Sequence, residues 1–363
     1  MDIEKIQKFF EKKGEPKYRI SQIKKAFYKD GILNFDKITT IPKHLRDSLI
    51  ENFKILSIEE KSILPNIPFS PKKSRANETK LYPAKALLRL NDMNIIETVL
   101  LPNENGWTCC ISTQAGCPLG CKFCATGKMG FKRNLTSEEI TDQILYWRAY
   151  INDDYVCRLR SEALSNIVYM GMGEPFLNWK NTKKSLEDLI NKNLFGYGSR
   201  SISVSTAGIP EGIINFAKNF PQMNLAISLH SANDKKRSDL MPINKKYGLF
   251  DLKNAIIEYF KITNRKIFME YLMLATVNDS LSDAEELKNL IISFPKKNLL
   301  HVNLIPYNET DNEFKPSQKN QIKKFEEYLL KNKIHTTIRK SLGKEIKGAC
   351  GQLGLASQSS SFL

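Results

Sequence analysis

The stretch TCCISTQAGCPLGCKFCATG, residues 108–127, joins a strand-like segment to a loop that carries three closely spaced cysteines. Segment 108–113 is predicted to be a β-strand, and Cys117, Cys121 and Cys124 follow it with the spacing C-x3-C-x2-C. Three thiolates this close in one loop can hold one face of a cubane iron–sulfur cluster and leave one iron open to a small molecule. A structural zinc site needs a fourth ligand, usually from a second pair of cysteines, and the sequence has no matching C-x2-C downstream.

After this loop, segments with the apolar pattern of a strand alternate with segments that have the apolar pattern of a helix. Further strands are expected at 166–171, 201–206, 224–229, 267–274, 300–305 and 335–340. Helices are expected between them at 137–150, 181–191, 210–219, 249–260, 282–293 and 317–332. Thr136 and Glu139 form a capping box before the first of these helices. Such alternation is typical of parallel strands joined by crossover helices, so the fold class is α/β, as a barrel or an open sheet.

Polar or glycine-rich loops follow the predicted strands. They are GMGEP at 171–175, Ser205-Thr206, Ser228-Leu229-His230 and Pro306-Tyr307-Asn308. In α/β folds ligands bind at the carboxyl ends of the strands, so we expect the functional site to be built from these loops and the cysteine loop.

The first third of the chain has a different pattern. Residues 1 to about 60 are predicted to form short helices, and residues 1–85 hold 19 basic against 11 acidic residues. The polar stretch 66–80 indicates a linker. Two apolar runs, 86–90 and 95–101, are split by Asn91-Asp92 and predict a β-hairpin.

Composition narrows the class of protein. The 363 residues include 55 basic and 39 acidic side chains, a net charge of +16 that attracts polyanions, of which nucleic acid is the commonest. A hydrophobic content of 41% excludes a disordered chain. No apolar run is long enough for a membrane span, and the first residues have no apolar signal region. Seven cysteines, locally clustered, indicate a reducing compartment, and we expect the cytoplasm.

Longer strings extend the pattern well beyond the three cysteines. The chain resembles the radical S-adenosylmethionine (SAM) RNA methyltransferases that modify adenine carbon 2 in 23S ribosomal RNA and in tRNA. The amino-terminal string EPKYRISQI at 15–23 fits the basic accessory domain of that family. The other matching strings are IETV at 96–99, CISTQAGCPLGCKFCATG at 110–127, GFKRNLT at 130–136, YMGMGEP at 169–175, VSTAG at 204–208, ISLHSAND at 227–234, MPIN at 241–244, NLIPYN at 303–308 and GACGQL at 348–353.

The resemblance implies a domain organisation. It predicts a basic helical RNA-binding accessory domain at 1–65, a linker and β-hairpin extension at 66–105, a partial (β/α)6 radical SAM barrel at 106–345 and a C-terminal segment at 346–363. It also implies one 4Fe-4S cluster, held by the three loop cysteines, and SAM, used twice per turnover. The implied partners are 23S ribosomal RNA, tRNA and an electron donor of the flavodoxin or ferredoxin type.

The resemblance also implies roles for single residues. By motif position Cys350 carries a methyl group as S-methylcysteine, and its methylene radical adds to the adenine ring. Glu97 aligns with the group that takes the ring proton from the protein–RNA adduct. Cys110 aligns with the cysteine that forms a transient disulfide with Cys350 as the product leaves. The implied SAM contacts are Gly173, Glu174, Ser205, Ser228, Leu229, His230 and Asn308.

Several of these residues have simpler interpretations. Unaided by the resemblance, Glu97 is a solvated charge on a strand edge and His230 a hydrogen-bonded core histidine. Cys109 and Cys110 are neighbours in one predicted strand, so only one of the two can face the site. Cys157 matches no motif. Lys347 stands where many family members are acidic, and its charge can lower the pKa of the Cys350 thiol or contact RNA phosphate.

Three competing functions remain open from the sequence. The nearest is methylation of adenine carbon 8, the activity of related antibiotic-resistance methyltransferases. A radical SAM activase of a protein substrate would not need Cys350. An RNA-binding module with a purely structural cluster would not cleave SAM.

Overall fold

The computed structural model of this chain describes residues 3–64, 82–104, 106–152, 163–310 and 312–354. Its centre is a ten-stranded sheet with the order β1-β2-β3-β4-β7-β8-β9-β10-β11-β12. The strands of this sheet are β1 (Ile58–Leu64), β2 (Ala84–Leu90), β3 (Ile95–Asn103), β4 (Gly106–Cys110), β7 (Leu164–Tyr169), β8 (Ile202–Thr206), β9 (Asn224–Ser228), β10 (Ile267–Met273), β11 (Leu300–Pro306) and β12 (Thr336–Ile338).

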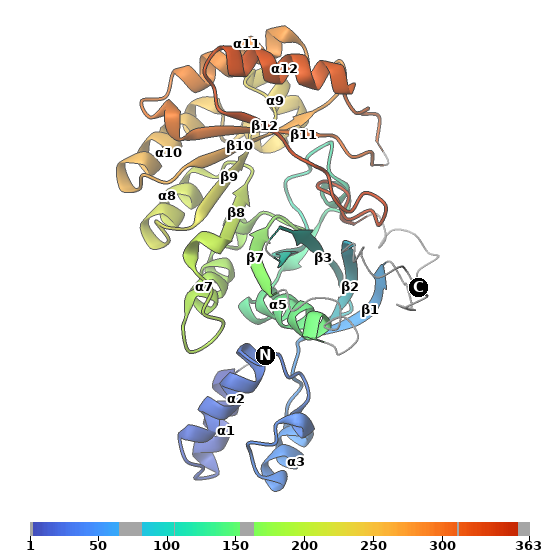
Figure 1. The fold of residues 1–363 in the computed structure, drawn as a ribbon, viewed down its shortest axis with the longest axis vertical. Coiled ribbons are helices and arrows are strands. Elements are labelled where there is room, and N and C mark those ends of the chain that lie inside the picture. The colour runs from blue at the N-terminus through green and yellow to red at the C-terminus, as the bar shows by residue number, and fades with distance from the viewer. Residues whose placement is uncertain (1–2, 65–81, 105, 153–162, 311, 355–363) are drawn as a thin grey trace.

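The strands from β4 to β12 are parallel and form the α/β part of the fold. Each neighbouring pair in this half of the sheet runs in the same direction. The sheet curves, and its edge strands β1 and β12 do not pair with each other in the described part of the chain (Figure 1). The expected α/β class with a partial barrel is therefore confirmed.

Helices connect the parallel strands and lie along the outer side of the curved sheet (Figure 1). Thr136 and Glu139 exchange side-chain to backbone hydrogen bonds of 3.2 and 2.9 Å, which confirms the predicted capping box before α5. None of the helices in the described ranges is long and apolar enough to cross a membrane. The helices of this half are α4 (Ala125–Lys128), α5 (Ser137–Asn152), α7 (Trp179–Ile190), α8 (Pro210–Asn219), α9 (Asp234–Leu240), α10 (Leu249–Ile262), α11 (Leu281–Ile292) and α12 (Lys319–Lys331).

The antiparallel end of the sheet contains the predicted hairpin and one strand that was not predicted. β2 and β3 pair around the turn at 91–94, as expected. β1 lies in a range that the sequence pattern assigned to short helices, yet it pairs antiparallel with β2. Its mostly exposed sequence, IEEKSIL, has only Ile58 buried, so it lacks the apolar alternation that marks a half-buried strand. The predicted linker at 66–80 lies outside the described residues.

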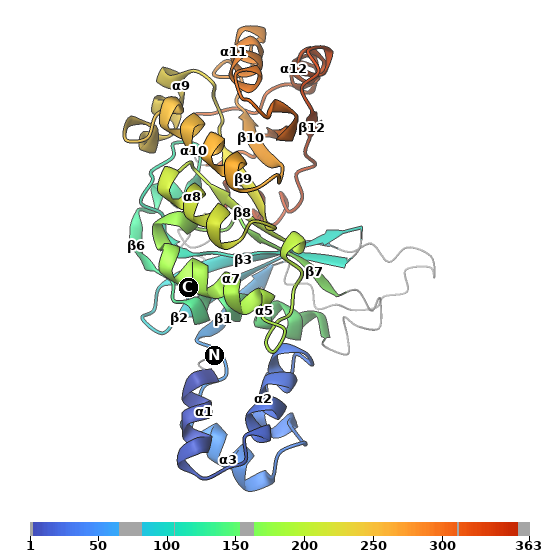
Figure 2. The same ribbon diagram turned by 90° about the vertical axis from the view of Figure 1, so that its left-hand side faces the viewer.

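The N-terminal helices form a separate lobe below α5 and α7 (Figure 2). They are α1 (Ile3–Lys12), α2 (Tyr18–Tyr28) and α3 (Lys43–Asn52), close to the predicted positions. Tyr28 of α2 packs edge-on against Phe195, with ring centroids 4.9 Å apart, and Lys29 donates to the Phe195 carbonyl at 3.1 Å. Arg148 of α5 also donates to the Tyr28 carbonyl, so aromatic packing and charge-assisted hydrogen bonds join the lobe to the barrel.

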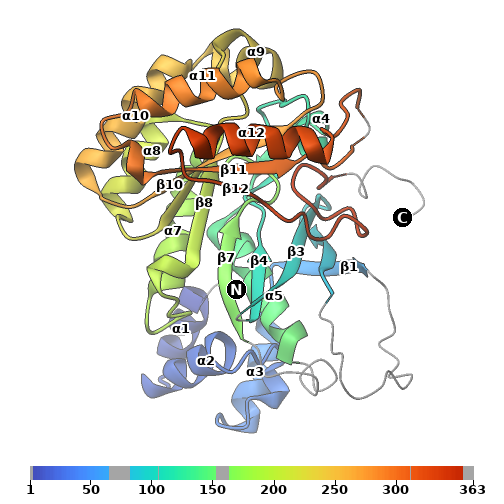
Figure 3. The same ribbon diagram turned by 45° about the horizontal axis from the view of Figure 1, so that its top comes forward.

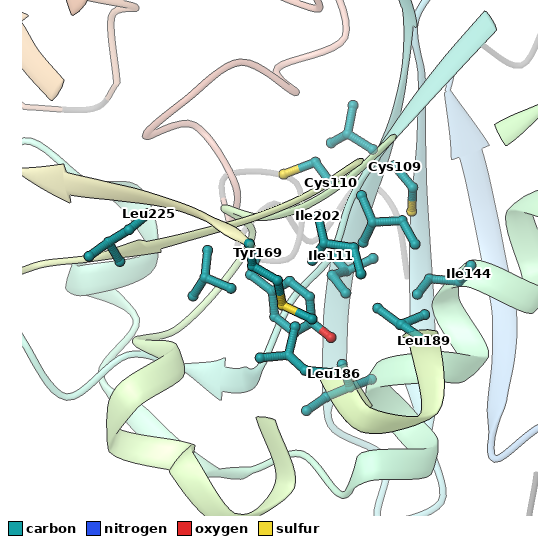
Figure 4. Packing of buried hydrophobic residues seen from close by; sticks show 14 of the residues in the cluster. Cys109, Cys110, Ile111, Ile144, Tyr169, Leu186, Leu189, Ile202 and Leu225 are labelled. Carbon is teal, nitrogen blue, oxygen red and sulfur yellow. The ribbon is translucent and has the colours of Figure 1, made fainter. Parts of the chain in front are cut away.

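The buried core lies between the sheet and its helices. Figure 4 shows apolar side chains from β4, β7, β8 and β9 meeting those of α5 and α7. Cys109 and Cys110 both belong to this core, and the Cys109 sulfur lies on the side of Ile144 and Leu189 whereas the Cys110 sulfur points the other way (Figure 4). The two neighbours therefore lie on opposite faces of β4, as expected for a strand.

Candidate active site

The cysteine loop leaves the sheet after β4 on a tight backbone path. β5 (Gln114–Gly116) and β6 (Phe131–Asn134) form a small antiparallel pair that frames the loop and α4. Gly116 has φ +74°, and a Cβ atom there would lie 1.9 Å from the Gly130 carbonyl oxygen. Only glycine fits this position, so the loop that carries the three cysteines is fixed by backbone contact.

The three cysteines line one cavity of about 180 Å³ at the carboxyl ends of the parallel strands. Burial raises the pKa of the Cys117 thiol to about 12 and the pKa of the Cys121 thiol well above its ordinary value, and the negative charge of the nearby Cys124 thiolate adds to both shifts. In the described residues no three His, Cys, Asp or Glu side chains converge on a point that would suit a single metal ion. The cysteines fit an iron–sulfur cluster, because they share one wall of one cavity and their thiolates need the positive charge of iron.

Most of the predicted SAM contacts share this cavity. Its lining includes Gly173, Glu174, Ser205, Ser228 and His230. Leu229 and Asn308 do not line it. Leu229 is buried, and its backbone carbonyl accepts a hydrogen bond from a buried arginine. The Asn308 amide nitrogen donates to the Cys350 carbonyl oxygen at 3.3 Å, so Asn308 contacts the C-terminal segment instead.

Glu174 is a buried carboxylate in the cavity wall. Its two oxygens accept from the backbone N–H groups of Phe176 and Ala207, at 3.0 and 2.7 Å. Burial raises the pKa of Glu174 to about 7, and these hydrogen bonds oppose the shift. Gly173, just before it, has φ +102°, and a Cβ there would meet the Gln114 side chain at 2.6 Å. A carboxylate held in this way is suited to bind an ammonium group.

His230 is a buried, hydrogen-bonded histidine and also lines the cavity where SAM contacts are expected. Its Nδ1 accepts from the Leu272 backbone N–H at 3.1 Å, which places the proton of the neutral ring on Nε2. Its ring meets Phe123 of the cysteine loop edge-on, with centroids 4.8 Å apart. Burial, and then the charge of Arg237, lower the pKa of His230 to about 3.

The protein is expected to lose stability as His230 becomes protonated. Its pKa is about 3 in the folded state and about 6.5 in the unfolded state, so neutral His230 supports the fold above pH 6.5. Between pH 6.5 and 4 this support should fall by about 3 kcal/mol. In His230→Asn an amide oxygen replaces Nδ1 as the acceptor without titrating. Urea unfolding at both pH values should therefore show a smaller loss for the variant, and equal losses would contradict the assignment.

Cys350 lies at the cavity beside Cys110. The C-terminal segment, residues 343–354, folds back over α4 and the strand ends (Figure 3). It is held there by hydrogen bonds from Ala125 N–H to the Gly351 carbonyl, 2.8 Å, and from Thr126 Oγ1 to the Leu353 carbonyl, 2.7 Å. Cys350 lines the cavity with the three loop cysteines. Burial raises the pKa of Cys110 to about 12, and the charge of the adjacent Cys350 thiolate adds to that shift.

Glu97 is buried and is not a solvated edge charge. Its Oε2 accepts from Lys85 Nζ at 3.1 Å, and both side chains are fully inaccessible to solvent. The edge-charge interpretation was wrong because β3 lies between β2 and β4, and the C-terminal segment covers the face of the sheet that carries Glu97. Glu97 and Cys110 are not in the cavity lining but lie on the sheet face that residues 346–350 cover.

Sequence reasoning missed an ion pair in the cavity wall. Arg339 Nη1 lies 3.3 Å from Glu270 Oε2, and both residues line the cavity. Arg339, rather than Lys347, is the cation that lowers the pKa of Cys350, against the stronger raising effect of burial. Glu270 was detectable as a lone acidic residue in the apolar strand sequence IFMEYLM. Cys157 lies outside the described residues.

Comparison with known proteins agrees with this geometry. Residues 111–291 match the Radical SAM superfamily, and residues 1–55 match the N-terminal domain of ribosomal RNA large subunit methyltransferases. The chain is 43% identical to Ribosomal RNA large subunit methyltransferase Cfr of Clostridium botulinum strain Loch Maree, over 93% of this chain and 92% of that protein. It is 39% identical to the probable dual-specificity RNA methyltransferase RlmN of Chlorobium phaeobacteroides, over 94% and 90%. The crystal structure of a radical SAM methyltransferase from Sphaerobacter thermophilus matches with a TM-score of 0.86 and 35% identity, over 97% of both chains.

The fold and the three-cysteine cavity define a radical SAM enzyme. Two relatives that align over nearly the whole chain narrow the class further. The chain belongs to the RlmN/Cfr family of radical SAM methyltransferases of large-subunit ribosomal RNA. Membership confirms the resemblance in the sequence and implies a 4Fe-4S cluster and SAM as cofactors.

Proposed function

We propose that this protein methylates carbon 2 of an adenine in 23S ribosomal RNA, and also in tRNA, through an S-methylcysteine at Cys350 and a transient protein–RNA adduct. The observation that carries the proposal is the place of Cys350, which lines the same cavity as Cys117, Cys121 and Cys124 and lies beside Cys110. A methyl carrier has to reach the cofactor cavity, and a resolving thiol has to reach the methyl carrier.

The cavity residues have separate tasks in this proposal. The three loop cysteines hold the cluster, and Glu174 binds the ammonium group of SAM. Cluster and SAM together supply the methyl group and a one-electron route to a carbon-centred radical. His230 fixes the cysteine loop through Phe123, and Asn308 orients the Cys350 backbone.

Product release is assigned to the residues beneath the C-terminal segment. Radical addition leaves one unpaired electron on the adduct, which would return to the electron-transfer centre held by the three loop cysteines, and Glu97 accepts the ring proton. The Cys110 thiolate then attacks the Cys350 sulfur, so that an S–S bond forms as the S–C bond to the product breaks. The electron pair of that bond stays on the product carbon, which takes up a proton to become the methyl group. A thiol reductant then restores both thiols.

The proposal extends to partners and location. The basic N-terminal lobe contacts RNA phosphates, because its charge is positive and its fold matches the N-terminal domain of ribosomal RNA methyltransferases. A flavodoxin or ferredoxin supplies the electrons, and the reaction takes place in the cytoplasm.

Mass spectrometry of the product tests the proposal. The protein is reconstituted with iron and sulfide without oxygen and is then given SAM, a reductant and a 23S ribosomal RNA fragment or tRNA. Digested RNA should contain 2-methyladenosine. Detection of 8-methyladenosine would show that the enzyme methylates carbon 8 instead of carbon 2. Unmodified RNA together with uncleaved SAM would favour a purely structural cluster.

A further inference from the structure

Lys85 is a fully buried lysine in the middle of the β2–β3 hairpin. Its side chain has no solvent exposure, and burial lowers the pKa of its ammonium group. Burying a charge is expensive unless the charge is paired and hydrogen-bonded. Neither the motifs nor the proposed mechanism gives this lysine a task.

The Lys85 ammonium group contacts two segments that are far apart in the sequence. It donates to Glu97 Oε2 at 3.1 Å and to the backbone carbonyl oxygen of Lys347 at 3.0 Å. Lys347 has φ +49°, a left-handed conformation that costs free energy for a residue other than glycine. The carbonyl that Lys85 contacts is therefore held in place at some conformational cost.

Strand register explains why these groups meet. Val99 pairs with Lys85 on one side and with Cys110 on the other, so all three side chains lie on one face of the sheet. Glu97 is two residues from Val99 and shares that face. Gly348 lies over Val99, where an added Cβ would be 3.4 Å from the valine methyl. The face therefore lies directly beneath the segment that carries Cys350.

The Glu97 carboxylate is only half satisfied. Its Oε1 atom is buried and has no hydrogen-bond partner among the described residues. A buried acceptor left unpaired costs about 1–3 kcal/mol, so a retained one needs an explanation. One oxygen fixed by a cation and one left free is the arrangement that a proton acceptor requires.

We propose that Lys85 is a positioning residue that holds one oxygen of Glu97, leaves the other oxygen free as the proton acceptor, and connects Glu97 to the docked C-terminal segment through the Lys347 carbonyl. This inference rests on the proposed function. In the assisted step the ring C–H bond of the adduct breaks, its electron pair stays on the ring, and the proton bonds to Glu97. Lys85 keeps its own protons throughout, so it is not a catalytic residue.

The groups around the Lys85–Glu97 pair come from three elements. Lys85 lies on β2, Glu97 on β3 and the Lys347 carbonyl in the C-terminal segment, and burial and then the positive charge of the Lys347 side chain lower the pKa of the Lys85 ammonium group. Without Lys85 the buried carboxylate loses the one cation that pairs with it among the described residues.

The first test follows resolution of the adduct. Lys85→Met should resolve the protein–RNA adduct at least about tenfold more slowly than wild type, because the Glu97 carboxylate is no longer held in place. Glu97→Gln should accumulate adduct. Arg89→Met is the matched control, because Arg89 lies in the same strand and pairs with Glu59 at the surface. Wild-type resolution in Lys85→Met would overturn the proposal.

The second test needs neither cofactor nor RNA. In cluster-free protein, iodoacetamide should alkylate Cys350 several-fold faster in Lys85→Met than in wild type or Arg89→Met, because the tie to Lys347 is lost. Peptide mass spectrometry gives the rate at Cys350. The double variant Lys85→Met/Glu97→Gln removes both buried charges, so it should fold and show the same acceleration. If alkylation of Cys350 is unchanged in both variants, Lys85 does not hold the C-terminal segment through the Lys347 carbonyl. If Glu97→Gln fails to accumulate adduct, the proposed function is contradicted, and the alkylation rates still test the contact between Lys85 and Lys347.

Discussion

Cys350→Ala is expected to lower RNA methylation by about three orders of magnitude or more, because no other described thiol at the cavity can carry the methyl group. The three loop cysteines are assigned to the cluster, and Cys110 lies outside the cavity lining. The Cys350 side chain is exposed while nearby residues of its segment are buried, so the variant should fold and bind iron like wild type. Mass spectrometry of the RNA, with iron analysis on the same sample, measures both results.

Cys110→Ala separates the roles of the two thiols. If Cys350 carries the methyl group and Cys110 resolves the adduct, Cys110→Ala should retain the RNA covalently, whereas Cys350→Ala should form no adduct. A denaturing gel shows the adduct directly as protein that migrates with RNA. Normal methylation by Cys350→Ala would instead favour an activase, which has no use for this residue.

Cys121→Ala is expected to abolish both iron binding and SAM cleavage. Its thiolate is one of three that line the cavity. With only two cysteines left, the loop cannot bind three irons of the cluster and keep the fourth iron open for SAM. Cys117→Ala and Cys124→Ala should behave alike. Iron analysis and the absorbance of the reconstituted cluster report binding, and the release of 5′-deoxyadenosine reports cleavage.

Cys109→Ala provides the control for these variants. Cys109 is buried in the core on the opposite face of β4, so its loss should cost some stability but no iron (Figure 4). Full iron content in Cys121→Ala, or zinc in place of iron in the wild-type protein, would contradict the assigned cluster site.

The chemistry of the site could be predicted from local sequence. The C-x3-C-x2-C spacing lies within one loop, and GMGEP directly follows its strand, so both depend on few long-range contacts. The alternation of apolar segments likewise predicted the parallel strands and their helices. Glu97 was a harder case, because the motif suggested its role but its strand alone indicated an exposed edge.

The tertiary structure decided which distant groups meet. β1 lacks the apolar alternation of a half-buried strand, yet it pairs with the outer edge of the hairpin, and the C-terminal segment covers the face of the hairpin. Lys85 and Lys347 are 262 residues apart, and Glu270 and Arg339 are 69 apart, so no sequence spacing could predict either contact. Sequence patterns alone are enough for the α/β class and the family, and they predict the cluster ligands. Only the folded chain determined the surroundings of Glu97 and Cys350, because burial and ion pairing depend on segments that meet through strand register and chain reversal.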